Sequence, residues 1–579
     1  SRIRRIVYLH FSDLRHEGNK NKSLIFFRLS SSRSCFFKNM KDHLLSFPTL
    51  TAIISILLFS LLLWIRAQKN SPNQRTKGKL LAPEPSGALP ILGHLHLLGA
   101  QAPLAHILAS FADKYGPIFT IRLGASPALV VSSQDAIKDC FTTNDKTLAN
   151  RPKSSHGVYL GYNMAGFGFA PDGPYWRKLR KLVMLELLSA RRVESLRYVY
   201  ESEIDVFIGD LYSYIGENNK RRVVICEWLE RLTVNIIVRM IAGKRYFGNL
   251  KDVDDEEARR VVKLIKDFMH ISGEFVPSDL IPFLGWFPWE GKVLRSMKKI
   301  ASDLDTLASS WVEEHRAKKK KEESSEKQDF IDFMLSVIEE DDSELGYTRD
   351  TIIKSNILSL ILAGADTTAI NMTWMLALLL NNKHVLKRAQ EEINVQVGNQ
   401  RWVQTSDTKN LPYLQAILKE TLRLYPAGPL LVPHEAAQDC YICGYYIPKG
   451  TRVFANVWKL HRDPTIWSQP ERFMPERFMT TENDGGGGGE IVDDNEGRHF
   501  SYLPFGSGRR ACPGSNFGMQ VSLLTLARLL QAFELQVEDD ETVDMREGTS
   551  FTLPKATPLE VVLTPRLSPH QCHLFSNTS

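Results

Sequence analysis

The segment FGSGRRACPG at 505–514 limits the possible folds more than any other part of the chain. Its glycine spacing fits a dinucleotide-binding turn, with a strand-like run at 500–505 before it, a helix-like run at 521–533 after it and acidic residues beyond. A dinucleotide fold needs further strand–helix–strand units after that turn. Only 65 residues follow Gly514, and none repeats the pattern. The interpretation as a dehydrogenase is therefore disfavoured.

Cys512 suggests a second use for the same segment, as a ligand of iron. A glycine-rich loop carries the cysteine into a helix, and Pro513 is suited to the first turn of that helix. Amide donors of the loop and the positive end of the helix stabilise a thiolate. A cysteine considered alone is more often a small buried apolar residue, which is the expectation for Cys140 and Cys226.

Five positions of the segment match the haem-binding signature of the cytochrome P450s, F-x-x-G-x-R-x-C-x-G: Phe505, Gly508, Arg510, Cys512 and Gly514. The resemblance extends from about residue 82 to 567 and is strongest to plant microsomal members. It implies haem b (iron protoporphyrin IX) as cofactor, bound at these positions, with Cys512 as the axial metal ligand. A thiolate pushes electron density onto iron and favours cleavage of the oxygen–oxygen bond. Arg510 is implied to contact a haem propionate.

A second motif lies in the long apolar stretch at 356–380, which Asp366 interrupts. A carboxylate at the middle of a lipid-facing helix is costly, so we expect a core helix here and not a membrane span. AGADTT at 363–368 resembles the family's oxygen-activation motif. The resemblance implies that Gly364 allows a local distortion beside the haem, and that Thr367 and Asp366 are catalytic, binding reduced dioxygen and relaying protons. Considered alone, such a threonine bonds its own preceding turn and such an aspartate is a structural partner.

Three further side chains resemble the family's haem-propionate partners. Trp176 and Arg180 are four residues apart and therefore share one face of a helix. His434, in the sequence Pro-His-Glu, falls where the family often has a third partner. A single histidine considered alone is more often a structural residue. The resemblance assigns all three to cofactor binding.

Glu420 and Arg423 lie three apart and resemble the family's E-x-x-R pair, which Arg477 joins in a network that supports the haem loop. Such pairs considered alone are commonly surface contacts. The sequence PERF occurs twice, at 470–473 and 475–478. The second copy stands at the family-like distance from Cys512, so the third member of the network is predicted to be Arg477.

The stretch 44–65 contains 22 residues without a charge, enough to cross the ~30 Å hydrocarbon layer as a helix. Lys and Arg residues follow it, which predicts that the large C-terminal part faces the cytosol. A cleaved signal peptide is disfavoured, because no small-residue cleavage site follows. Residues 1–39 would blur the charge asymmetry, and Met40 offers an alternative start. We expect 1–39 to be a disordered or non-native extension.

The remaining sequence is dominated by helical periodicity, as at 193–215 and 293–316, with short strand candidates at 118–123, 128–131 and 441–453. The predicted fold class is mainly α, a single large haem-thiolate monooxygenase domain with a small β-rich part, preceded by one N-terminal transmembrane helix. The predicted boundaries are an extension at 1–39, a membrane anchor at 40–66, a basic and proline-rich linker at 67–90, the domain at 91–567 and a tail at 568–579.

Charge and cysteine content exclude some partners. A net charge of +6, spread over 72 basic and 66 acidic residues, does not favour nucleic acid, and none is expected. The seven cysteines are odd in number and widely spaced, which suits a reducing compartment. Cys440 and Cys443 form a lone C-x-x-C without the second pair of a zinc site, and we interpret it as a coincidence.

The resemblance implies insertion of one oxygen atom from dioxygen into a small organic substrate, at the endoplasmic reticulum membrane. NADPH would act indirectly, through a membrane-bound flavoprotein reductase. YPAGP at 425–429 and LPKATP at 553–558 resemble a plant group of specialised metabolism. Hydroxylation of a phenolic such as a flavonoid or coumarin is the prediction, with alkaloid or terpenoid oxidation or demethylation as the alternative. Reductase-independent haem-thiolate rearrangement is a further alternative, which the intact Asp366–Thr367 pair disfavours, and the complete set of motifs disfavours a non-catalytic binding protein.

Overall fold

The computed structural model divides the chain into two compact units, Ser1–Gly78 and Lys79–Ser579. The extension at 1–39, most of the predicted membrane helix at 44–65 and the tail at 568–579 lie outside the described residues. No helix among the described residues is long and apolar enough to cross a membrane. The described residues are 51, 55, 59, 78–99, 102–218, 222–247, 256–281, 284, 291–320, 328–339, 346–479, 500–538 and 541–567.

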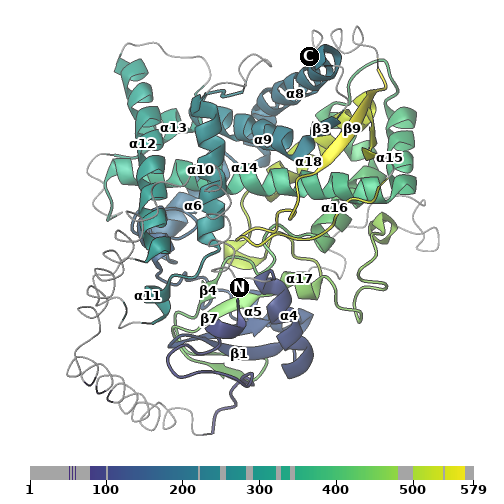
Figure 1. Cartoon of the computed structure of the whole chain (residues 1–579). Coiled ribbons are helices and arrows are strands. Elements are labelled where there is room, and N and C mark those ends of the chain that lie inside the picture. The colour runs from purple at the N-terminus through teal and green to yellow at the C-terminus, as the bar shows by residue number, and fades with distance from the viewer. Residues whose placement is uncertain are drawn as a thin grey trace, which may run out of the picture. The chain divides into compact units, whose positions relative to one another are not determined.

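The second unit is mainly helical, as predicted, and Figure 1 shows its helices gathered around α14. The long apolar stretches of the sequence become helices because their side chains are buried on more than one face. Its α-helices are α4 (Leu104–Tyr115), α5 (Gln134–Phe141), α6 (Pro174–Glu186), α7 (Ala190–Ser195), α8 (Arg197–Asn218), α9 (Ile225–Ala242), α10 (Glu256–Ser272), α11 (Pro277–Leu280), α12 (Lys292–Lys320), α13 (Phe330–Val337), α14 (Arg349–Asn381), α15 (Lys383–Gln396), α16 (Pro412–Leu424), α17 (Val457–Leu460) and α18 (Ser515–Ala532).

Helix α14 is the central element of the helical part. The hydroxyl of Thr348 caps its first turn by accepting a hydrogen bond from the Thr351 amide. Almost every side chain from Ala369 to Leu380 is buried, and the helix packs against α9, α10, α12, α16 and α18. The prediction of a core helix at 356–380 is confirmed, and the helix is longer than predicted.

A four-stranded sheet forms the β-rich part, which Figure 1 shows together with α4 and α5 on one side of the helices. β1 (Ile118–Leu123) pairs antiparallel with β2 (Ser126–Val131), as the strand candidates predict. β2 then pairs in parallel with β7 (Arg452–Ala455), and β7 pairs antiparallel with β4 (His434–Glu435). The sheet thus carries His434 opposite Val453, although these residues come from a segment some 300 positions later than β1.

Two smaller sheets complete the strand content of the described residues. β3 (Arg222–Val224), β9 (Glu560–Pro565) and β8 (Phe533–Gln536) form an antiparallel sheet in that order. β5 (Cys440–Ile442) and β6 (Tyr445–Ile447) form a hairpin within the predicted strand region 441–453. The four-stranded and three-stranded sheets therefore join segments that are distant in the sequence, whereas the β5–β6 hairpin is local.

Three sequence expectations are wrong in detail. The run at 500–505 forms turns and no strand. The predicted helix at 193–215 is split at Leu196 into α7 and α8. Gly364 does not distort α14, which is an unbroken α-helix there, and instead lets α9 approach: a Cβ at this position would lie 3.0 Å from Ile237 Cδ1.

Candidate active site

The loop that carries Cys512 is closed by one backbone hydrogen bond. The Cys512 amide donates to the Phe505 carbonyl at 2.9 Å, and a single 3-10 turn, η9 (Gly508–Arg510), lies between them. Helix α18 begins at Ser515 with Gly514 as its N-cap residue. Pro513 therefore lies just before the helix and not in its first turn, which corrects that expectation. The closed loop fixes the backbone on which the thiol stands.

Gly508 is required by the loop for two reasons. Its φ of 69° is in the left-handed region, and an added Cβ would overlap the Asp145 carboxylate, which accepts a hydrogen bond from the Arg509 amide at 2.9 Å. Gly514 differs in both respects: its φ is −93° and an added Cβ would meet no atom within 4 Å. Neither the backbone conformation nor a close contact within the polypeptide therefore requires glycine at 514. The missing side chain leaves open space beside Cys512.

The Cys512 thiol is accessible to solvent and yet desolvated. The residue is exposed to solvent, yet the protein atoms around the sulfur partly desolvate the thiol and raise its pKa. A hydrogen bond from the Gly514 amide and the charge of Arg180 oppose this increase. A thiol on an outer surface would not be desolvated in this way. The combination indicates a sulfur recessed within the protein, and a coordinated metal ion would deprotonate it outright.

Arg510 and Arg180 both lie close to the buried Trp176 indole. The guanidinium carbon of Arg510 is 3.8 Å from the ring centroid, and that of Arg180 is 5.6 Å from it. Arg510 donates to the carbonyl oxygens of Ala149 at 2.7 Å and Ala170 at 2.6 Å. Desolvation lowers the pKa of Arg510 to about 10 and also lowers that of Arg180. The sequence predicted these three residues to share a site, and the structure brings them together.

Arg151 is a fourth member of this group, and the sequence analysis missed it. It is buried and donates to the carbonyl oxygens of Val432 and Pro433, each at 2.8 Å. Burial and the neighbouring Arg510 charge lower its pKa. From sequence, a lone arginine in a connecting segment is expected at the surface, because only the tertiary fold buries it against the strand at 434. The apolar residues Leu148 and Ala149 just before it were the only indication in the sequence that Arg151 is buried.

His434 is held as a neutral imidazole. Its Nδ1 lies 2.7 Å from the Leu148 carbonyl oxygen, and because a carbonyl only accepts, Nδ1 carries the proton. Burial and the nearby Arg151 and Arg510 charges lower its pKa to about 3. In this tautomer Nε2 is an acceptor. His434 can therefore donate to a propionate only after an anion beside it has raised its pKa.

The residues present fit the haem group. None of the three buried or half-buried arginines forms an ion pair with a carboxylate among the described residues, and the Trp176 indole N–H has no acceptor there. Uncompensated buried cations and an orphaned donor are costly unless an anion completes them. The two carboxylates of a haem supply that charge, Cys512 supplies an iron ligand, and the space at Gly514 admits a flat ring.

On α14, Ala363 is exposed in the middle of a helix whose neighbours are buried, and Thr367 lies one turn later on the same face. The Thr367 hydroxyl donates to the Ala363 carbonyl oxygen at 2.7 Å, so its proton is used within the helix and its lone pairs remain as acceptors. Burial raises the pKa of Asp366 to about 6, against a hydrogen bond from Thr552. A carboxyl with this pKa exchanges protons readily near neutral pH.

The predicted network around Glu420 is present and fully buried at its centre. Arg423 donates to both carboxylate oxygens of Glu420 at 2.7 and 2.9 Å, and Arg477 donates to Oε1 at 3.0 Å. Arg472, from the first PERF copy, contributes only its carbonyl oxygen. The network ties α16 to the short helix η7 (Pro475–Phe478), and the choice of Arg477 over Arg472 is confirmed.

The C-x-x-C pair lies in a short hairpin and forms no disulfide. Cys440 and Cys443 lie in the β5–β6 hairpin, and all the cysteines described are free. Burial and Asp139 raise the pKa of Cys440 to about 11 and raise that of Cys443 as well. A thiol with a raised pKa is a poor nucleophile and a poor metal ligand at neutral pH. The interpretation as a coincidence is consistent with this environment.

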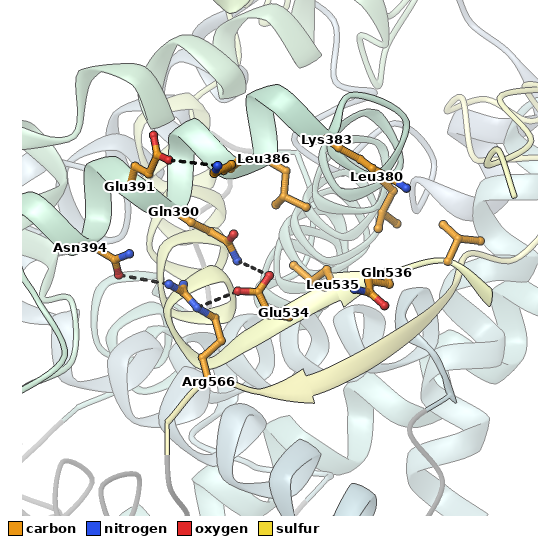
Figure 2. Close-up of a pocket in the computed structure, with 12 residues that line it drawn as sticks. Leu380, Lys383, Leu386, Gln390, Glu391, Asn394, Glu534, Leu535, Gln536 and Arg566 are labelled. Atoms are coloured by element: carbon orange, nitrogen blue, oxygen red, sulfur yellow. Dashed lines mark hydrogen bonds and ion pairs between the residues drawn. The ribbon is translucent and has the colours of Figure 1, made fainter. Parts of the chain in front are cut away.

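A pocket of about 490 Å³ lies elsewhere, between α15 and the β8–β9 pair. Figure 2 shows Arg566 between Asn394 and Glu534, to which it donates at 3.2 and 3.1 Å. None of the predicted site residues lines this pocket. Its polar groups pair with one another, so it offers no convergent set for catalysis.

Comparison with known proteins identifies the family. The family model for cytochrome P450 matches residues 83–561. The chain is 60% identical to cytochrome P450 CYP82J17 of Trigonella foenum-graecum over 531 residues, which cover 91% of this chain and 99% of that protein. It is 49% identical to xanthotoxin 5-hydroxylase CYP82C4 of Arabidopsis thaliana (84% of this chain, 93% of that protein) and 46% identical to nicotine N-demethylase CYP82E3 of Nicotiana tomentosiformis (90% and 98%).

These relatives are plant enzymes of specialised metabolism, and they align over almost their full lengths. The helical fold, the recessed thiol and the uncompensated arginines agree with the match. The chain belongs to the cytochrome P450 family and is a haem-dependent monooxygenase.

Proposed function

We propose that this enzyme hydroxylates a small phenolic plant metabolite, with a coumarin-type aromatic as the first candidate. The 49% identity to a xanthotoxin 5-hydroxylase supports an aromatic ring as the site of oxidation. The 46% identity to a nicotine N-demethylase favours alkaloid demethylation as the second candidate. Both reactions begin with insertion of one oxygen atom, so the same catalytic residues serve either substrate.

The cofactor site is assigned from the contacts described above. Bound haem supplies activation of dioxygen, and Cys512 is its iron ligand. Arg510, Arg180 and Trp176 hold the propionates, since two cations and an unpaired indole N–H converge there. His434 completes this set in its protonated form. Phe505, Gly508 and Gly514 shape the loop, by the closing hydrogen bond, the left-handed turn and the open space respectively.

The proton path is assigned to α14. Burial raises the pKa of Asp366 to about 6, so this carboxyl takes up and releases a proton readily near neutral pH, although it is mostly charged at pH 7. The Thr367 hydroxyl, on the accessible face of the helix, accepts a hydrogen bond from a protonated group opposite it, because its own proton is donated to Ala363. Asp366 is thus the proton source. Thr367 orients the reduced dioxygen that receives this proton.

The proposal extends to the membrane. Residues 40–66 form a single anchor in the endoplasmic reticulum, with the domain at 91–567 in the cytosol. The charge-free run at 44–65 and the basic residues after it support this orientation. Electrons originate in NADPH and arrive through a membrane-bound flavoprotein reductase, which avoids any need for a nicotinamide site in this chain.

The test is product analysis with isotopically labelled dioxygen. Membranes that contain the full chain and a plant reductase are incubated with NADPH and a panel of coumarins, flavonoids, alkaloids and terpenoids. We expect one labelled oxygen in a coumarin or flavonoid product, lost in Cys512→Ala and retained in the matched control Cys440→Ala. A labelled alkaloid product, or loss of a methyl group, would transfer the assignment to the second candidate. NADPH-independent product would contradict monooxygenation.

A further inference from the structure

A hairpin loop near the C-terminus reaches the middle of α14. Its two sides are joined by the bridge between Glu547 and Lys555 and by the hydrogen bond from the Gly548 amide to the Pro554 carbonyl at 2.8 Å. Thr552 lies within this loop and is 3% exposed. The sequence motif 553–558 suggested a plant subgroup, but the role of the loop itself was not predicted.

Three contacts fix the loop between α10 and α14. The Trp374 indole donates to the Leu553 carbonyl at 2.7 Å, and the Ser550 hydroxyl donates to the Met269 carbonyl at 3.2 Å. Gly273 follows α10, and a Cβ there would lie only 2.7 Å from the Phe551 amide nitrogen, so the backbones are in close contact. The position of Thr552 is therefore determined from both sides.

A fourth contact reaches the predicted proton source. The Thr552 hydroxyl donates to Asp366 Oδ2 at 2.9 Å. Because Thr552 is buried and its loop is fixed, this bond selects one orientation of a carboxyl group that is itself shielded from water. The hydrogen bond also favours the charged form of the carboxyl and so opposes the effect of burial on its pKa.

Two further charged groups act on Asp366, and they oppose each other. Glu230 on α9 raises its pKa and Lys266 on α10 lowers it. They form an ion pair with Lys266 Nζ 2.8 Å from Glu230 Oε2. Because each screens the other, Thr552 is the one neighbour among the described residues that both touches the carboxyl and sets its orientation.

We propose that Thr552 is a positioning residue for proton delivery, which acts by holding the Asp366 carboxyl in the orientation needed for transfer toward Thr367. The inference rests on the proposed function and deepens it. Without the hydroxyl the carboxyl is free to rotate, and the two electrons from NADPH together with two protons then convert dioxygen to hydrogen peroxide, instead of reducing one oxygen atom to water while the other enters the product. Binding of substrate does not depend on this contact.

The test compares Thr552→Val and Thr552→Ala with Thr552→Ser. Thr451→Val is the matched control, because Thr451 is equally buried and its hydroxyl has no hydrogen-bond partner among the described residues. The first readout is the infrared carboxyl band that Asp366→Asn removes, followed against pH. We expect Thr552→Val and Thr552→Ala to shift its midpoint upward by about one pH unit, since a hydrogen bond to a charged group contributes roughly that much.

The second readout is product formed per NADPH consumed. We expect it to fall about tenfold at pH 7 in Thr552→Val and Thr552→Ala, with KM unchanged, and to recover in Thr552→Ser, because a misplaced catalytic group loses about one to two orders of magnitude in rate. A carboxyl midpoint and a coupling ratio equal to those of Thr451→Val would overturn the proposal. If the unsubstituted enzyme forms no product, the proposed function fails while the infrared midpoints still test the Thr552 contact.

Discussion

The contacts of Arg510 depend on the planar shape of its guanidinium group. Its guanidinium donates to two carbonyl oxygens from different segments while it stacks on Trp176. Lysine cannot reproduce this planar fork. Arg509, the next residue, is half exposed and makes a 3.4 Å ion pair with Asp145, which contributes little. Two adjacent arginines thus have very different importance.

We therefore expect Arg510→Lys to lower the free energy of unfolding by about 2 kcal/mol and to reduce bound haem per protein, whereas Arg509→Lys changes both by little. Urea unfolding and the ratio of haem to protein absorbance measure the two effects. Equal losses in the two variants would show that the carbonyl contacts of Arg510 do not matter.

Gly508 supports a second prediction at this scale. Gly508→Ala must adopt a left-handed φ and displace the Asp145 carboxylate, at a cost of about 2 kcal/mol or more. Gly209, inside α8 with open space around it, is the matched control, because alanine there should increase stability by up to about 1 kcal/mol. Thermal unfolding of both variants decides the matter, and a stable Gly508→Ala protein would contradict the steric argument.

Some site residues could be predicted from the sequence and others could not. Cys512, Arg510 and Gly508 stand in one short motif, so their proximity is encoded locally. Arg151 and Thr552 reach the site from segments about 400 residues apart, and no local pattern distinguishes them from ordinary surface residues. Only the tertiary fold determines which of many arginines and threonines is buried at the site.

At the scale of elements, α16 and η7 depend on a buried ion network. Glu420 lies between two guanidinium groups, and both it and Arg423 are fully buried. Glu420→Gln would leave two cations without a full counter-charge, and we expect it to cost about 3–5 kcal/mol. Glu391→Gln is the control, because that carboxylate is 61% exposed and its partner Lys387 is 78% exposed, so their pairing contributes at most about 1 kcal/mol. Denaturant midpoints that coincide would argue against a structural role for Glu420.

Elements with a strong local signal were predicted well. β1 and α14 follow from hydrophobic patterns that extend over their own lengths. The run at 500–505 has strand-like composition, yet it forms turns and belongs to none of the sheets among the described residues. The pairing of β2 with β7 joins residues more than 300 positions apart, and pattern alone does not specify such partners.

For the whole molecule, the buried histidines predict sensitivity to acid. His461 accepts a hydrogen bond from the Leu503 amide through Nε2 and contacts the Arg423 carbonyl through Nδ1, so only the neutral form fits. Burial lowers its pKa to about 3, far below that of an unfolded histidine. Between about pH 6.5 and 3 the unfolded chain therefore binds one more proton at this position, and stability falls as pH falls.

Because of His461, we expect the free energy of unfolding to fall by about 1.4 kcal/mol for each pH unit of acidification within that window. His461→Gln, which keeps a donor and an acceptor without a titrating group, should flatten the dependence by one proton, while the exposed His384→Gln should not. Urea midpoints between pH 7 and 5 measure the slope. An unchanged slope in His461→Gln would show that this histidine does not control acid stability.

Arg151, Arg180 and Arg510 form no ion pair with a carboxylate in the part of the chain that the structure describes, and this has a consequence for the protein before it binds haem. Until a dianionic prosthetic group arrives, like charges repel inside the fold and the Trp176 indole lacks an acceptor. Newly made chains that find no haem will therefore open more often and be degraded, because proteases act on open states. We therefore expect the chain without haem to unfold at a lower urea concentration than the chain with haem.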